Sequence, residues 1–322
     1  MEAWKLLGEL AKQRDSAGQR RLAVVVGSGL NVQAGVRDSW LALLERIATE
    51  ARIERAAKDR LMQMLNQTGG SGMTSIWEAF LCELANADEA PHQVEQRLQR
   101  DVAELLRETH ERKAAELEFF QAFVDLGFAD ILSLNFDRSL LIATGGEDIS
   151  GDGTLTRRGR AGGSRVWYPH GDTKLCRSIR LGVRSYGVYI KELDSAYRGY
   201  RQMRRAAKGA ATAPQRGASG AERRPAVESP RNWLEAAMTQ PLLFVGCGLS
   251  TDEWPLWWVL HQRGRAQARR PRRHRDPCFV LCAGAMERIS PHLRSGPAGL
   301  RLLHAPSHGE SWRQLSSTLK GG

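Results

Sequence analysis

The sequence has few cysteines and no long apolar run, and each absence excludes a class of protein. Its 322 residues include five cysteines, none spaced as C-x-x-C, at Cys82, Cys176, Cys247, Cys278 and Cys282. We therefore expect neither disulfide bonds nor a bound metal. No apolar run reaches the ~20 residues of a membrane-spanning helix. The first twenty residues are typical of an amphipathic helix rather than a signal peptide, so a cytoplasmic protein without membrane contact is expected.

Positive charge is concentrated in two segments. The composition, 42% hydrophobic and 26% charged, is that of a globular protein. The formal net charge is +11, yet residues 198–224 carry eight basic residues and one acidic residue, and residues 263–275 carry seven arginines and no acidic residue. The rest of the chain is therefore slightly acidic. Such segments bind nucleic acid or an acidic partner, or are simply solvated, and the sequence leaves these alternatives open.

Short apolar stretches alternate with helical patterns along the chain. Strands are predicted near residues 22–26, 129–134, 165–168, 241–245, 278–282 and 300–305. This alternation predicts an α/β fold with a Rossmann-like, doubly wound parallel sheet. Residues 49–127, between the first two strands, are helical throughout and form an inserted helical module. We expect a single domain over residues 1–322, with a basic, flexible linker at 198–230.

Glycines and polar residues follow four of the predicted strands. A glycine turn follows the first strand and another follows the fourth, while Asn-Phe-Asp follows the second and Pro-His-Gly the third. Ligands bind parallel α/β sheets at the carboxyl ends of the strands, and glycine turns let backbone N–H groups approach a phosphate. The candidate site residues are Gly27, Ser28, Gly29, Asn31, Asn135, Asp137, His170, Gly246, Cys247 and Gly248.

Placed around one crevice, these residues suit a dinucleotide whose glycosidic bond is broken. The turn at 27–29 would bind the pyrophosphate, and the turn at 246–248 the other phosphate or the adenine ribose. Cleavage of a nicotinamide–ribose bond passes through a cation-like sugar. Asn135 would fix the nicotinamide and ribose, Asp137 would orient the ribose, and His170 would accept a proton from a ribose hydroxyl or from water.

Each of these residues also has a purely structural interpretation. Asp137 is a natural helix cap, Ser28 and Asn31 can make turn or cap hydrogen bonds, and His170 can be a loop histidine bound to backbone. The glycines can let helices pack close to strands. Cys247 lies in a strand-to-helix turn, but the G-x-S-x-G nucleophile pattern is absent, which favours packing or backbone contact with a ligand over nucleophilic attack.

Four short sequences resemble, in the same order, the motifs of the sirtuin family. GSGLN, LNFD, PHG and FVGCG correspond to G-A-G-x-S, T-Q-N-x-D, H-G and G-T-S of that family. The resemblance covers residues 22–319 and implies NAD binding on a Rossmann-like sheet. By motif position, Asn135 and Asp137 match the nicotinamide- and ribose-binding pair, and His170 matches the catalytic base. Sirtuin deacylases carry a four-cysteine zinc module after H-G, where this chain has only Cys176, so no zinc module is expected.

The departures make the chain resemble divergent bacterial sirtuin-like proteins that deplete NAD in antiphage defence. Residues 133–134 are Ser-Leu instead of T-Q, and residues 37–40 keep only the aspartate of P-D-F-R. The resemblance implies an NAD glycohydrolase, controlled by homo-oligomerisation or by a second defence protein such as an ATPase, a helicase or an Argonaute. The alternatives are an NAD-dependent deacylase or ADP-ribosyltransferase, and a non-catalytic scaffold that binds NAD or ADP-ribose and associates with nucleic acid.

Overall fold

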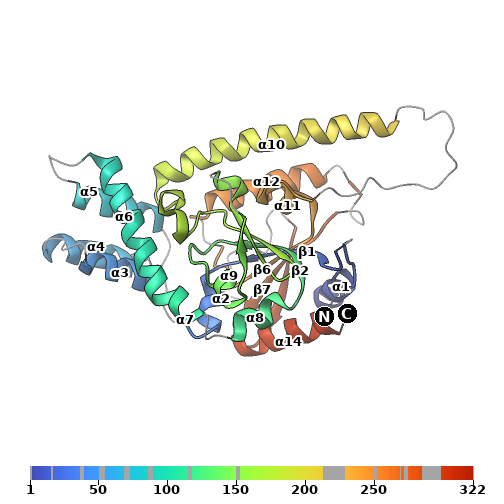
Figure 1. Ribbon diagram of the computed structural model, residues 1–322, viewed down its shortest axis with the longest axis horizontal. Helices are drawn as coiled ribbons and strands as arrows, with labels where there is room; N and C mark the ends of the chain where they lie inside the picture. Colours follow the sequence, from blue (N-terminus) through green and yellow to red (C-terminus); the bar gives the residue numbers. More distant parts are fainter. Residues whose placement is uncertain are drawn as a thin grey trace.

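A central sheet lies between two layers of helices, and a separate helical module stands beside one end of it (Figure 1). The computed structural model describes residues 2–15, 17–36, 40–50, 55–68, 73–85, 90–114, 118–149, 153–212, 229–249, 252–268, 270–271, 275–284 and 299–321. Both ends of the described chain lie on the same side of the molecule, where helix α1 packs against helix α14.

The sheet has eight strands in the order β3-β4-β5-β2-β1-β6-β7-β8. Their bounds are β1 Arg20–Val26, β2 Phe128–Ser133, β3 Glu147–Asp148, β4 Arg158–Ala161, β5 Ser164–Trp167, β6 Leu242–Val245, β7 Cys278–Ala283 and β8 Leu300–Ala305. Neighbouring strands in the stretch β5-β2-β1-β6-β7-β8 pair in parallel. Strands β3 and β4 pair antiparallel and form one edge of the sheet beside β5. Strand order running outward from β1 in both directions is the Rossmann arrangement. The predicted fold class is confirmed, whereas the antiparallel edge was not predicted.

Helices cover both faces of the sheet and build the module. Their bounds are α1 Glu2–Ala11, α2 Ser28–Gln33, α3 Trp40–Glu50, α4 Arg55–Thr68, α5 Met73–Leu84, α6 Pro91–Leu106, α7 Arg112–Ala114, α8 Glu118–Val124, α9 Ser139–Ala143, α10 Val183–Thr212, α11 Trp233–Thr239, α12 Trp254–Ala268 and α14 His308–Lys320. A π-helical turn, η1 (Arg107–Glu111), links α6 to α7, and the 3-10 helices are η2 (Thr154–Thr156) and η3 (Thr173–Ser178). Within the described residues, no helix is long and apolar enough to cross a membrane.

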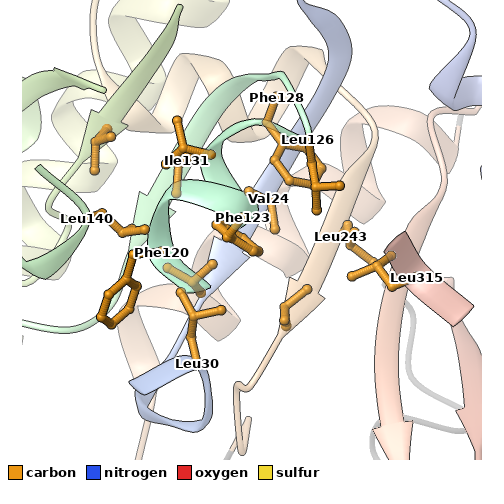
Figure 2. Packing of buried hydrophobic residues seen from close by; sticks show 14 of the residues in the cluster. Val24, Leu30, Phe120, Phe123, Leu126, Phe128, Ile131, Leu140, Leu243 and Leu315 are labelled. Carbon is orange, nitrogen blue, oxygen red and sulfur yellow. The ribbon is translucent and has the colours of Figure 1, made fainter. Parts of the chain in front are cut away.

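The two faces of the sheet have separate cores, because side chains alternate along each strand. Val24 and Val26 of β1 face a core shared with α1, α8 and α14, which Figure 2 shows around Val24, Phe123 and Leu315. Val25 faces the opposite core, shared with α10, α11 and α12. Burial of β1 on both faces explains why its sequence is a continuous apolar run rather than an alternating one.

The helical module has its own core, and its bounds differ from the predicted 49–127. Apolar residues of α3 to α6 form a third cluster, to which Phe136, Ile179 and Leu181 of the sheet domain also belong. The module begins earlier than predicted, with α3. It also ends earlier, because Phe120 and Phe123 of α8 are buried in the sheet core. Helix α8 is thus the crossover helix of the sheet rather than part of the module.

The predicted linker at 198–230 begins as helix. Helix α10 continues to Thr212, and residues 213–228 lie outside the described part of the chain. Tyr197 and Tyr200 pack into the core beneath the helix, and Arg198 pairs with Asp194 one turn before it. Apolar anchors at helical spacing with ion pairs at i and i+4 stabilise a helix, whereas the composition of the segment had favoured disorder.

Candidate functional site

The loops that follow four parallel strands meet at the middle of the sheet edge. β1 lies between β2 and β6, and β5 lies next to β2, so the carboxyl ends of these strands are adjacent. From β1 the chain continues to one side of the sheet, and from β6 it continues to the other. The boundary between β1 and β6 is therefore the switch point at which sheets of this kind bind ligands.

The two glycine turns pack directly against each other. The N–H of Gly27 donates to Val245 O at 3.1 Å, and the N–H of Gly29 donates to Gly246 O at 3.0 Å. A Cβ on Gly29 would lie 2.7 Å from Gly246 Cα, and one on Gly246 would lie 2.5 Å from Leu30 N. The glycines therefore allow a close approach of two backbones. Because two N–H groups of the turn are already used, its binding of a phosphate stays a prediction.

The second turn contains one strained residue and one open position. Gly246 has φ +63°, and the buried Leu249 has φ +46°, a value that crowds the Cβ of an L-residue. Gly248 differs from both, because a Cβ there would meet no atom of the described residues within 4 Å. Of the three predicted positions in this turn, Gly248 is thus the one where the structure leaves room for a ligand.

Asn31, Asn135 and Asp137 form a hydrogen-bonded cluster between the ends of β1 and β2. Asn31 Nδ2 donates to Asp137 Oδ2 at 2.8 Å, and Asn135 Nδ2 donates to Asn31 Oδ1 at 3.3 Å and to Gly27 O at 3.2 Å. Asp137 Oδ1 accepts the N–H of Ser139 at 3.1 Å, which is the bond of an Asx turn just before Arg138, the N-cap residue of α9. With the amide NH2 of the half-buried Asn135 engaged twice, its Oδ1 is the group left to contact a ligand.

His170 is enclosed by aromatic rings and bound to one carboxylate. The ring stacks on Tyr186 at a centroid distance of 5.4 Å and meets the edges of Phe136 and Tyr189, each at 6.4 Å. Its Nε2 lies 3.0 Å from Oε2 of Glu253. Its Nδ1 is buried, and within the described residues it has no hydrogen-bond partner. The ring therefore has a fixed orientation, with one nitrogen committed and the other unsatisfied.

Phe136 connects this histidine to the asparagine–aspartate cluster. It stands between Asn135 and Asp137 in the sequence, and its backbone O accepts the N–H of Thr173 at 2.9 Å. The loops after β2 and β5 are thus joined through both backbone and side chains. The two predicted catalytic residues, Asn135 and His170, lie on adjoining loops, although the described structure contains no direct hydrogen bond between them.

The backbone around His170 is fixed by its neighbours. Gly171 has φ +88°, and a Cβ there would lie 2.1 Å from Ser178 O, so the position requires glycine. The next residue, Asp172, is buried, and both of its oxygens bind the guanidinium of Arg157, at 2.6 and 2.8 Å. The Pro-His-Gly sequence therefore marks a rigid turn that holds the histidine at the end of β5.

Cys247 is placed as a packing residue. Its thiol donates to Val25 O at 3.3 Å. Burial raises the pKa of the Cys247 thiol, and the negative charge of nearby Glu253 raises that pKa further. Because the thiolate rather than the thiol is the nucleophile, this environment disfavours nucleophilic attack by Cys247.

Two acidic residues reach the site without having been predicted. Glu253 precedes α12 and contacts His170. Glu111, on the π-turn η1, accepts the N–H of Arg138 at 2.9 Å and the hydroxyl of Thr173, so the helical module holds the loops after β2 and β5 together. Glu111 gave no sequence signal, because only tertiary packing brings it there. Glu253 did have a sequence signal, because it is a carboxylate at the start of a helix that follows a glycine turn.

The two basic segments meet around Tyr200, and part of the second is structural. Burial raises the pKa of Tyr200, against the opposing charges of arginines from both segments. Arg263 is buried and donates to two backbone carbonyls, one of them that of Asp276. Arg270 pairs with the Asp276 carboxylate at 3.3 Å. Arg263 is therefore a structural residue rather than a solvated one, and residues 269 and 272–274 of this segment lie outside the described residues.

No protein-family model matches the sequence, and no curated protein matches it. In the described part of the chain, no group of three or more His, Cys, Asp or Glu side chains is placed to hold a metal ion. The fold and the site together define the class as a Rossmann-like α/β protein with a polar cluster at its switch point.

Proposed function

We propose that this protein is a sirtuin-like NAD glycohydrolase, which converts NAD and water to nicotinamide and ADP-ribose. The observation that carries the proposal is the meeting of the Asn135 and His170 loops beside the switch point of a Rossmann-order sheet. The order of the four motifs along the chain, which resembles that of sirtuins, makes NAD the preferred dinucleotide.

In this proposal the polar cluster acts on the nicotinamide ribose. Asn135 Oδ1 accepts a hydrogen bond from the nicotinamide amide or a ribose hydroxyl, because its NH2 group is already held by Asn31 and Gly27. Asp137 acts through Asn31, because its two oxygens accept hydrogen bonds from that residue and from the backbone N–H of Ser139. A rigid amide of this kind orients the ground state and stabilises the charge that develops as the bond breaks.

The glycine turns receive the phosphates and the adenine ribose. Gly248 has room for a ligand, whereas the turn at 27–29 offers its remaining polar groups, including the hydroxyl of Ser28. His170 supplies the proton acceptor, directly or through Glu253, to which it is hydrogen-bonded. The proposal needs no metal, because the departing nicotinamide is neutral once its bond to the sugar has broken.

The biological role we propose is NAD depletion in bacterial antiphage defence, under the control of a second protein or of self-association. The resemblance to defence sirtuins supports this role. Glu111 accepts hydrogen bonds from the loops after β2 and β5, so a partner that moved the helical module would move both loops and thereby change the activity. A nucleic-acid partner would bind along the basic helix α10.

The experiment is an end-product analysis with the purified full-length chain, alone and mixed with the products of neighbouring genes. We expect NAD to fall while nicotinamide and ADP-ribose rise in equal amounts, as resolved by chromatography. O-acyl-ADP-ribose or modified protein in place of free ADP-ribose would indicate the deacylase or ADP-ribosyltransferase alternative. NAD that stays intact in every mixture, beside an active control enzyme, contradicts the proposal.

Two variants tie the activity to the site. Asn135→Ala and His170→Ala should each lower turnover by ~10²-fold or more, the usual loss when one positioned catalytic group is removed. His261→Ala is the matched control, because His261 is an exposed histidine on α12 and lies outside the site. Turnover that stays near the wild-type value in both site variants would contradict the assignment of these residues.

A further inference from the structure

Glu253 occupies a position in the proposed site that no motif assigns to it. We propose that Glu253 is a catalytic residue whose carboxylate faces the nicotinamide ribose and stabilises its positive charge, with His170 holding the carboxylate in place. This inference rests on the proposed function. Here Glu253 contacts the sugar and His170 positions Glu253, whereas the motif-based expectation has His170 itself contacting the sugar.

The exposure of the pair indicates which member meets the substrate. Glu253 Oε2 lies 3.0 Å from His170 Nε2, and the side chain of Glu253 is 26% exposed whereas that of His170 is 3% exposed. The ring is closed in further by Tyr186, which stacks on it. A ligand that approaches this pair from solvent therefore reaches the carboxylate before the imidazole.

The other carboxylates near the strand ends are already committed. Asp137 accepts from Asn31 Nδ2 and from a backbone N–H, and Asp172 is paired with a buried arginine. Glu111 accepts from a backbone N–H and from Thr173. Glu253 has the histidine as its one side-chain partner within the described residues, so one of its oxygens remains to face a cationic group.

Glu253 also stands between the two halves of the site. It contacts the loop after β5 through His170, and its negative charge raises the pKa of the Cys247 thiol in the turn after β6. The same charge adds to the effect of burial in raising the pKa of Tyr186. A dinucleotide with its phosphates near Gly248 would therefore bring its nicotinamide ribose toward this carboxylate.

The chemistry of glycosidic cleavage favours an anion at this place. The bond from C1′ to the nicotinamide nitrogen breaks with both electrons leaving on nicotinamide, and the sugar becomes an oxocarbenium-like cation. The carboxylate of Glu253 stabilises that charge more strongly than a neutral imidazole can. The oxygen of water then bonds to C1′, and its proton passes to the Glu253–His170 pair and from there to solvent.

The first test replaces the charge and keeps the shape. Glu253→Gln preserves a hydrogen bond to His170, so we expect kcat for NAD hydrolysis to fall by ~10²-fold or more while KM stays within about threefold. Glu192→Gln is the matched control, because Glu192 is a surface carboxylate that pairs with Arg180 at 3.4 Å, and its kinetics should match the wild type. A Glu253→Gln enzyme with unchanged kcat overturns the inference.

The second test separates chemistry from structure. Glu253→Ala leaves a space beside His170. Added sodium formate should raise the kcat of this variant at least tenfold, whereas sodium chloride at equal ionic strength should leave it unchanged. Loss of kcat without any formate rescue, together with a lowered melting temperature, would give Glu253 a structural role and overturn the inference. If wild-type protein never cleaves NAD, the proposed function fails and this inference fails with it; if wild type cleaves NAD and Glu253→Gln does too, only the inference fails.

Discussion

The glycine turns and the polar cluster lie side by side at the same switch point, but the structure uses them differently. In the glycine turns, backbone packs against backbone, and a Cβ on Gly29 or Gly246 would collide with the other turn. In the polar cluster, side chains hold one another, and Asn135 keeps one acceptor for a ligand. A glycine motif after a strand can therefore reflect how closely two loops pack, whereas the polar residues after neighbouring strands mark the place where we propose that a ligand binds.

The largest expected effect comes from breaking the glycine contact. Gly246→Ala forces a side chain into a positive φ and against Leu30 N, so we expect a loss of roughly 3–5 kcal/mol in the free energy of unfolding, measured by chemical denaturation. Gly248→Ala is the matched control and should change stability by less than about 1 kcal/mol, because no atom of the described residues lies within 4 Å of a Cβ added there. Equal stability of the two variants would refute the packing role of the first glycine.

The next effect comes from breaking the polar cluster at its buried end. Asp137→Ala leaves the amide of Asn31 and the N–H of Ser139 without their acceptor, so stability should fall by about 2–3 kcal/mol. Asp125→Ala, at an exposed aspartate on the surface, should cost less than about 0.5 kcal/mol. Thermal denaturation of the two proteins side by side measures the difference, and equal melting temperatures would show that the cluster adds no stability.

A smaller effect on folding, with a larger one on binding, is expected at Asn135. Asn135→Ala removes two long hydrogen bonds, at 3.2 and 3.3 Å, from a half-buried side chain, which should cost about 1 kcal/mol of stability. Affinity for NAD should fall at least tenfold in calorimetric titration, because the proposed nicotinamide contact is lost. A variant that is strongly destabilised but binds NAD normally would make Asn135 a structural residue like the glycines.

The smallest effect is expected at Cys247. Because its thiol pKa is raised, the thiolate fraction at pH 8 is lower than that of an ordinary cysteine, so alkylation by iodoacetamide should be slow. The exposed Cys82 should be labelled first, and mass spectrometry of digested protein resolves the two sites. Labelling of Cys247 as fast as that of Cys82 would show that the Cys247 thiol is reactive and would contradict its role as a packing residue.

Most of the fold was predictable because it follows from local patterns. The apolar run of β1 is continuous since both of its faces are buried, and alternation of strands with helices leads to a parallel sheet. The antiparallel edge was missed because its strands β3 and β4 are short and charged and lie within residues 145–164, a stretch rich in glycine. The sequence pattern predicts helix α10 only to about Arg205, and its continuation to Thr212 was missed because the composition of residues 198–230 favoured a flexible linker.

The candidate site was predictable where each residue follows its own strand. Asn135 and His170 could be found in this way, because parallel strands end at one edge. Glu253 and Glu111 could not be assigned with the same ease, because their places depend on how a helix start and a separate module pack against the sheet. Sequence patterns thus locate residues at strand ends, whereas tertiary packing determines which other residues join them.

The central claim is that the nicotinamide ribose lies against the polar cluster and the phosphates lie near the glycine turns. Saturation-transfer NMR with carba-NAD, in which a carbon replaces the ring oxygen so that the bond is not cleaved, tests it most directly. We predict strong saturation of the nicotinamide protons by the wild-type protein, its loss in Asn135→Ala, and its retention in His261→Ala. Equal nicotinamide saturation in all three proteins, or none in the wild type, would contradict the account.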